Sequence, residues 1–359
     1  MKLRAAALAL LLTGSAVLAQ DDAAPVQSSM TPAELTAALH GWLAPQAQSG
    51  AFAGVVLVAR DGKVLFERAY GTADRERGTP MSTDLRFSVA SIGKAFTRVA
   101  IGQLVQQGKL RFTDTLGSVL PDYPNPEARG ATITQLLTHT GGIVDFFGPE
   151  FDAAAKDRFR SNADYFAFVA PKPLLFPPGT RNQYCNGCYI VLGEVIAKIS
   201  GGPYERYIQE HVFGPAGMKT AGFLSVGDPA VAQPYTRRRG DGVTPVAAVG
   251  MHGLRGSAAG GAFARPADLL AFDQAVRSER LLNPVLTEWY YQNLPEDGVP
   301  AAMKEGRANG DRRAIGIAGG APGMNALLEA GPVWTIAVAG NLDPPNAGRI
   351  ATALRRALR

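Results

Sequence analysis

The strand-like segments of this chain lie near its two ends, and its middle has the patterns of helix and loop. Residues 54–59 and 64–70 are apolar and rich in β-branched side chains, and Asp61-Gly62 between them predicts a hairpin with a tight turn. Strand-like runs return at residues 314–317, 325–329 and 333–340. Strands at both ends with helices between them predict an α+β fold, in which the two ends pair into one antiparallel sheet.

Helical patterns flank and separate these runs. Thr31-Pro32-Ala33-Glu34 has the form of a capping box with proline at the first helical position, and it predicts a helix to about Leu43. A short third strand is expected near residues 85–88, and a terminal amphipathic helix at 347–358. The expected helices of the middle are residues 91–107, 134–137, 163–169, 189–200, 203–211 and 266–276.

These elements predict two lobes within one domain. The sheet lobe is expected from about residues 31–88 and 300–359, with the terminal helices covering the sheet, and a mainly helical lobe from about 89–299. A cleft between two lobes is a common place for a ligand site.

Residues 1–19 have the pattern of a secretory signal peptide. Lys2 and Arg4 precede an apolar run, and Val17-Leu18-Ala19 offers a small-residue cleavage site. The apolar run is too short to span a bilayer, so we expect no stable membrane span. The pattern predicts that residues 20–359 form a single domain that is exported to the periplasm or secreted.

The charge and the metal-binding residues exclude several classes of partner. The formal net charge is +5, and it falls to +3 without residues 1–19. Basic residues are scattered rather than gathered in a stripe, which argues against a nucleic-acid partner. Two cysteines and four scattered histidines make a zinc site a poor fit.

The two cysteines, Cys185 and Cys188, leave two states open. An oxidising compartment allows a short-loop disulfide, and two reduced thiols fit the sequence equally well. A redox function for this Cys-x-x-Cys is a third class of hypothesis. It is disfavoured because no thioredoxin-like βαβ pattern surrounds the pair.

The chain contains a single Ser-x-x-Lys, formed by Ser91 and Lys94 at the start of an expected apolar helix. Positions i and i+3 share a helix face, so the hydroxyl and the amine can meet. A neutral lysine can take the proton of a serine, and burial lowers a lysine pKa toward neutrality. The tetrapeptide alone is better explained by a polar first helical turn with a solvated lysine, because it is common by chance.

A second motif, Tyr-x-Asn, occurs at Tyr123, Tyr184 and Tyr291. The first lies in a proline-rich turn and the third at a helix end, where packing explains them. Tyr184-Cys185-Asn186 follows Pro177-Pro178-Gly179 and precedes a helix, so its phenol can be held in a cleft and transfer protons. The simpler alternative is a capped helix start with a half-buried tyrosine.

With these motifs the chain resembles the serine β-lactamase-related family: class C β-lactamases, D-alanyl-D-alanine carboxypeptidases and related esterases. The resemblance implies a β-lactamase/transpeptidase-like fold and hydrolysis through an acyl-enzyme on Ser91, without metal or organic cofactor. It implies that Lys94 is the base or proton partner, Tyr184 a general base and Asn186 a substrate-binding residue, and that His139 is structural. The segments that carry the resemblance are residues 52–58, 87–97, 136–142, 178–180, 184–193 and 260–261.

The third motif departs from the family pattern. The family has Lys-Thr-Gly or His-x-Gly on a strand lining the cleft, and Ile317 stands here in place of the lysine or histidine, followed by Gly319 and Gly320. Isoleucine cannot bind a substrate carboxylate. The backbone N–H groups of Gly320 and Ser91 would still form an oxyanion hole, worth roughly 3 kcal/mol per donor.

These features favour an esterase-type hydrolase acting on a small-molecule ester, amide or peptide. The alternatives are a β-lactamase, a D-Ala-D-Ala carboxypeptidase or penicillin-binding protein, and a non-catalytic ligand-binding protein of the same fold, since fold alone does not fix function. The sequence does not specify an oligomeric state.

Overall fold

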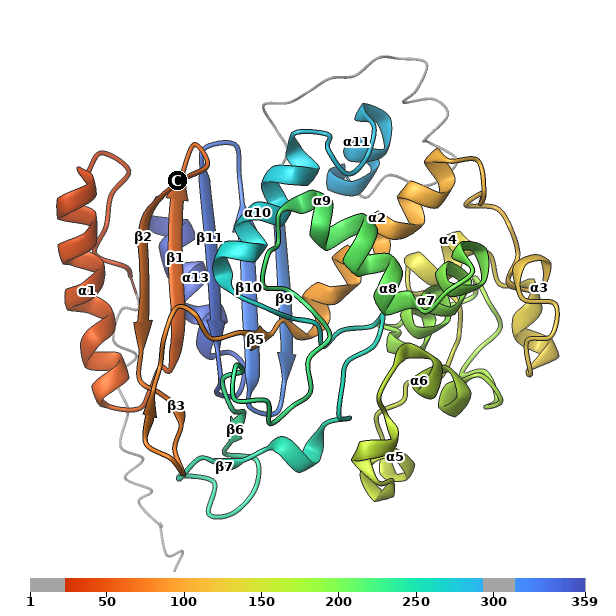
Figure 1. Cartoon of the computed structure of the whole chain (residues 1–359), viewed down its shortest axis with the longest axis horizontal. Coiled ribbons are helices and arrows are strands. Elements are labelled where there is room, and N and C mark those ends of the chain that lie inside the picture. Colours follow the sequence, from red (N-terminus) through yellow and green to blue (C-terminus); the bar gives the residue numbers. More distant parts are fainter. Residues whose placement is uncertain (1–22, 293–313, 359) are drawn as a thin grey trace, which may run out of the picture.

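A five-stranded antiparallel sheet joins the two ends of the chain, in the strand order β2-β1-β11-β10-β9 (Figure 1). The computed structural model describes residues 23–292 and 314–358, so the expected signal peptide lies outside the described residues. The register pairs Val56 of β1 with Val338 of β11, which confirms the predicted pairing of the ends. The strands are β1 Gly54–Arg60, β2 Lys63–Tyr70, β9 Ile315–Ala321, β10 Met324–Ala330 and β11 Trp334–Gly340.

Two terminal helices cover one face of this sheet. Helix α1 (Pro32–Gln48) packs on β2, and α13 (Asn346–Ala357) packs on β10 and β11, with a shared apolar core. The capping box at Thr31 is present as predicted. The helix α1 continues past the predicted end, because Pro45 lies on its exposed side, where water can satisfy the carbonyl that proline leaves unpaired.

The other face of the sheet carries the main core and the helical lobe. Figure 1 shows α1 beyond β2 and the helical lobe on the side of β9. Helix α2 (Gly93–Gln106) runs through this core, and α10 (Pro266–Arg277) contacts β1, β10 and β11. Helix α10, which lies within the residues expected to form the helical lobe, therefore packs directly on the sheet.

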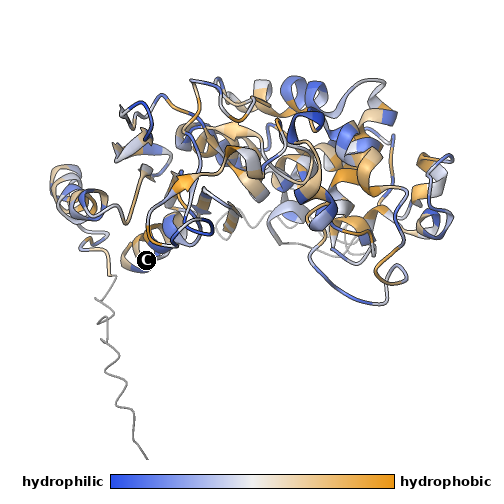
Figure 2. Cartoon of the chain, turned by 90° about the horizontal axis from the view of Figure 1, so that it is seen from below, coloured by the Kyte–Doolittle hydropathy of each residue, from blue (hydrophilic) through white to orange (hydrophobic). Residues whose placement is uncertain are grey.

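The remaining helices build the lobe opposite the sheet. Figure 2 shows hydrophobic segments in the middle of the molecule and hydrophilic ones mostly along its outline. No helix in the two described ranges is long and apolar enough to cross a membrane. The remaining helices, which form the lobe opposite the sheet, are α3 Leu116–Val119, α4 Ile133–Leu137, α5 Pro149–Ala153, α6 Asn162–Val169, α7 Asn186–Ser200, α8 Tyr204–Ile208, α9 Gly214–Ala216 and α11 Pro284–Gln292.

Short strand pairs connect segments that are distant in the sequence. Strand β5 (Phe87–Ser88) pairs with β8 (Phe263–Ala264) rather than with the main sheet. This pairing brings the segment that precedes Ser91 against the residues that follow Gly261, and it sets one side of the site described below. The other short strands are β3 Thr72–Asp74, β4 Thr79–Pro80, β6 Tyr235–Thr236 and β7 Val246–Ala247, none of which the sequence predicted.

Phe96 of α2 provides a test of how the lobes are held together. Its side chain is fully buried and makes edge-to-face contacts with Phe213 and Phe272, whose ring centroids lie 5.0 and 4.8 Å away. We expect Phe96→Ala to lower the free energy of unfolding by about 3–5 kcal/mol in urea titrations. Val64→Ala, at an exposed position of β2, should change it by less than about 0.5 kcal/mol. Equal effects of the two substitutions would contradict this packing.

Candidate active site

Ser91 lies in a short 3-10 turn, Ala90–Ile92, between β5 and α2. The residue before it, Ala90, has φ of +43°, a backbone conformation that L-residues rarely adopt and that is often found at functional sites. Gly260 packs so closely against this turn that an added Cβ would lie 2.5 Å from the Ala90 carbonyl oxygen. The turn is therefore held rigidly, with Ser91 at the start of a buried helix, as its sequence predicted.

Lys94 is buried one turn further along, with 8% of its surface exposed. Its Nζ lies 2.7 Å from Asn186 Oδ1, 2.5 Å from the carbonyl oxygen of Ala259 and 3.3 Å from Ser91 Oγ. Burial lowers the pKa of Lys94 to about 7, and the Asp145 carboxylate opposes that shift. A substantial neutral fraction near pH 7 follows, which a lysine needs in order to accept a proton.

Tyr184 lies beside Ser91, two residues before the start of α7. Its hydroxyl donates to Ser91 Oγ at 2.7 Å, and Lys94 Nζ lies 4.7 Å from the centre of its ring. Burial raises the pKa of the phenol above its ordinary value, and the hydrogen bond to Ser91 opposes this rise. The resting phenol is therefore protonated. Since Tyr184 is still 53% exposed, it is also open to a ligand.

Asn186 begins α7, and both polar atoms of its side-chain amide are hydrogen-bonded. The Oδ1 atom accepts from Lys94, and Nδ2 donates to Asp145 Oδ2 at 2.7 Å. The other carboxylate oxygen of Asp145 accepts from the backbone N–H of Phe147 at 3.0 Å. One carboxylate thus orients the amide beside Lys94 and also the loop that carries Phe147.

His139 supports the loop of Tyr184. Its Nδ1 accepts from the backbone N–H of Cys185 at 3.1 Å, and its ring packs 4.9 Å from the ring of Tyr184. Burial, with the nearby charge of Lys94, lowers the pKa of His139 to about 4. A neutral ring that accepts from a backbone N–H fits the structural role that the resemblance implied.

The third motif lies on β9, the edge strand nearest Ser91. Gly319 packs so closely that an added Cβ would lie 2.1 Å from the carbonyl oxygen of Val89 and 3.0 Å from the Ser91 nitrogen. Only glycine fits this approach. Ile317, two residues earlier, is partly buried and packs on the main core, while Gly320 lines the cavity beside Ser91.

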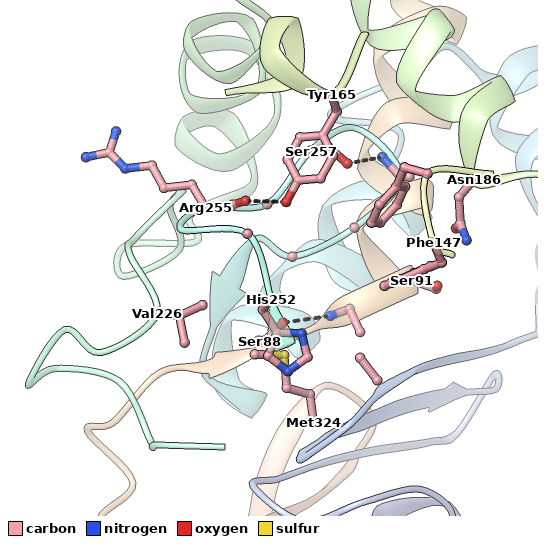
Figure 3. Close-up of a pocket in the computed structure, with 18 of the residues that line it drawn as sticks. Ser88, Ser91, Phe147, Tyr165, Asn186, Val226, His252, Arg255, Ser257 and Met324 are labelled. Atoms are coloured by element: carbon pink, nitrogen blue, oxygen red, sulfur yellow. Dashed lines mark hydrogen bonds between the residues drawn. The ribbon is translucent and has the colours of Figure 1, made fainter. Parts of the chain in front are cut away.

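That cavity opens beside Ser91 (Figure 3). Ser91, Asn186 and Gly320 line it, together with Phe146, Phe147 and the segment that ends at Gly261. Tyr184 and Ile317 are outside its lining.

Cys185 and Cys188 are joined by a disulfide within the segment that carries Tyr184 and Asn186. Of the two states that the sequence left open, a disulfide and two reduced thiols, the structure contains the disulfide. No group of three or more histidine, cysteine, aspartate or glutamate side chains in the described part of the chain could hold a metal ion.

The structure brings Ser91, Lys94, Tyr184 and Asn186 into one hydrogen-bonded group. It places Gly319 and Gly320 beside that group and Ile317 further along the same strand. Asp145 was not predicted from the sequence. Its position three residues after the Thr140-Gly141-Gly142 loop was the only available sign that it could belong to the site. The aromatic wall that Phe146 and Phe147 give to the cavity was not predicted either.

Comparisons with known proteins agree with this geometry. The family model described as "Beta-lactamase" matches residues 39–359. A putative penicillin-binding protein, PbpX of Bacillus subtilis (strain 168), is 32% identical over 232 residues, which are 64% of this chain and 56% of that protein. Esterase EstB of Burkholderia gladioli is 32% identical over 225 residues, 59% of this chain and 57% of the esterase.

The chain spans little more than half the length of these two curated relatives. Among solved structures, a penicillin-binding protein from Bacillus halodurans superposes with a TM-score of 0.73. The superposition covers 87% of this chain and 98% of that protein, at 24% identity. At this identity the likeness shows the fold, which is the predicted β-lactamase/transpeptidase-like one.

The charge of Asp145 can be tested through the reactivity of Ser91. We expect the rate of Ser91 labelling by a fluorophosphonate to rise with pH through about 7, as Lys94 loses its proton. Because the carboxylate of Asp145 raises the pKa of Lys94, Asp145→Asn should move the midpoint of this rise to lower pH. Asp152→Asn, an exposed position on α5, should leave the midpoint in place. An unchanged or higher midpoint in Asp145→Asn would show that its charge does not act on Lys94.

Proposed function

The chain belongs to the beta-lactamase family, and from that premise we propose that it is a serine hydrolase that forms an acyl-enzyme on Ser91 and prefers esters. The observation that carries the proposal is the chain of contacts from the Tyr184 hydroxyl through Ser91 Oγ to Lys94 Nζ. A nucleophile with a base on one side and a proton donor on the other is the arrangement that acyl transfer requires.

The contacts of Lys94 support its role as the base for acylation. Asn186 Oδ1 and the Ala259 carbonyl can only accept, so two N–H groups of the amine point to them. In the neutral amine the remaining position is the lone pair, which faces Ser91 Oγ. As Oγ attacks the substrate carbonyl, its proton passes to Lys94.

Tyr184 supplies the second proton transfer. The phenol gives its proton to the leaving oxygen, and the newly charged Lys94 beside its ring stabilises the phenolate. In the second half of the reaction the phenolate takes a proton from water, and the hydroxide attacks the acyl-enzyme. Ser91 then leaves and regains its proton from Lys94, which restores the starting state.

The tetrahedral oxyanion is stabilised by the backbone N–H groups of Ser91 and Gly320. The close approach of Gly319 to the Ser91 nitrogen supports this pairing, because it brings β9 against the turn that carries Ser91. Donors fixed in advance in this way contribute roughly 3 kcal/mol each to the stability of a transition state.

The preference for esters rests on Ile317. A carboxylate-bearing substrate, such as a penicillin or a D-alanyl peptide, needs a cation on this strand, and Ile317 provides none. The similarity to esterase EstB supports the same choice. A penicillin-binding function remains the second candidate, because PbpX and the structure from Bacillus halodurans are described as penicillin-binding proteins.

We also propose that the protein works outside the cytoplasm. The signal-like pattern of residues 1–19 motivates this, and the disulfide between Cys185 and Cys188 supports it, because disulfides persist in oxidising compartments.

The proposed function is tested by the intact mass of the protein after treatment with a fluorophosphonate, p-nitrophenyl acetate or a penicillin. We expect a fluorophosphonate adduct, turnover of the ester and no turnover of the penicillin, with the adduct absent in Ser91→Ala. A stable penicillin adduct would instead favour the penicillin-binding function. No adduct with any reagent, from a folded protein, would favour a non-catalytic binding protein.

A cation introduced at position 317 tests whether Ile317 excludes carboxylate-bearing substrates. We expect Ile317→His to raise kcat/KM for carboxylate-bearing substrates relative to neutral esters, and more so below the histidine pKa. Ile315→His is the matched control, since it places a histidine two residues earlier on β9, also beside the main core. No gain in Ile317→His, or an equal gain in both variants, would show that Ile317 does not exclude carboxylates.

A further inference from the structure

We propose that the cavity beside Ser91 binds the acyl part of the substrate and selects neutral, apolar acyl groups. This assignment rests on the proposed function, and it names the substrate class of that site. It follows from where the cavity lies relative to Tyr184, from the side chains that line it, and from the contacts that already occupy its polar groups.

The position of the cavity decides which half of the substrate enters it. Tyr184 gives its proton to the leaving group, so the leaving group lies on the side of Tyr184. The cavity lies elsewhere: Ser91, Asn186 and Gly320 line it, and Tyr184 does not. The acyl chain, which extends from the same carbonyl away from the leaving group, is therefore the part that enters the cavity.

Apolar side chains form the walls of the cavity. Phe146, Phe147 and Phe151 come from the loop and helix that follow Gly142, Val226 from a loop beyond α9, and Met324 from β10 (Figure 3). The Phe146 and Phe147 rings lie 4.1 Å apart between centroids, and Phe147 is 48% exposed. An apolar acyl group would cover this exposed ring, which is a favourable change.

The polar side chains of the lining are already hydrogen-bonded within the protein. Tyr165 donates to the carbonyl oxygen of Arg255 at 2.8 Å, and His252 Nε2 lies 2.8 Å from the carbonyl oxygen of Pro322. The hydroxyl oxygens of Ser88 and Ser257 accept from the backbone N–H groups of Ala90 and Ala259. These groups orient the walls and do not call for a polar acyl chain.

The charges around the cavity oppose an anionic acyl group. The Arg255 guanidinium extends away from the cavity in Figure 3, and its Nε lies 3.4 Å from Ser225 Oγ. Burial lowers the pKa of His252, so its ring is neutral. Asp145 lies behind Asn186 and Phe147 and adds a negative charge. An acyl carboxylate would lose water without gaining a cation inside the cavity, which is costly.

The test keeps one leaving group and varies the acyl group. We would measure kcat/KM for the acetyl, phenylacetyl, pentanoyl and hemisuccinyl esters of p-nitrophenol, where the last two are similar in length and differ in terminal charge. We expect phenylacetyl to exceed acetyl by at least about tenfold, since a single methylene in an apolar pocket is worth that much. Pentanoyl should exceed hemisuccinyl by a similar factor.

Two variants in the cavity and one control outside it test whether the cavity causes the preference for phenylacetyl over acetyl esters. Phe147→Ala should lower the phenylacetyl-to-acetyl ratio by removing a wall, and Val226→Trp should lower it by filling the space. Val64→Ala, at an exposed position of β2 outside the lining, should leave the ratio unchanged. A normal ratio in both cavity variants would show that this cavity does not hold the acyl group.

The outcomes separate this inference from the proposed function. Turnover of all four esters without preference, or a preference for hemisuccinyl, would overturn the acyl assignment and leave the hydrolase intact. No turnover of any ester, together with no fluorophosphonate adduct on Ser91, would overturn the proposed function and the acyl assignment with it.

Discussion

The burial of a single amine governs the organisation of this site. Lys94, on α2, lies in the core beside the turn that carries Ser91, the start of α7 and the segment around Ala259. Each of these three neighbours presents one atom to it: Ser91 Oγ, Asn186 Oδ1 and the Ala259 carbonyl oxygen. An ammonium there loses its hydration, which brings its pKa to about 7. The same burial that suits the amine to its proposed role as a base also requires that every neighbouring polar atom be placed to satisfy it.

Other residues hold these neighbours of Lys94 in place. Asp145 fixes the amide of Asn186, and His139 and the disulfide between Cys185 and Cys188 fix the backbone between Tyr184 and α7. Since Asp145 also binds the N–H of Phe147, the loop that walls the cavity and the amide beside Lys94 share one anchor. The proposed reactivity of Ser91 and the shape of the proposed acyl pocket are therefore linked through one carboxylate.

Local patterns predicted many of the elements well, and they failed where distant segments meet. The hairpin at Asp61-Gly62, the capping box at Thr31 and the helix after Ser91 were all predicted, because each depends on residues close in sequence. The pairing of β5 with β8 was not, since two-residue strands carry too little periodicity to be recognised. The position of α10 against the sheet was missed for a related reason, because amphipathicity shows that a helix has a buried face and not what covers it.

The sequence by itself determined the antiparallel pairing of the chain ends, the spacing of Ser91 and Lys94 on one helix face and the loss of a cation at Ile317. These follow from local periodicity, helix geometry and the chemistry of one side chain. The sequence also favoured Tyr184 over Tyr123 and Tyr291, and the structure places its hydroxyl against Ser91. Only the tertiary structure decided that Asp145 supports Asn186 and that the cavity beside Ser91 is apolar. The physical reason is that burial and hydrogen-bond geometry depend on atoms from several distant segments, and a linear pattern does not specify how those segments meet.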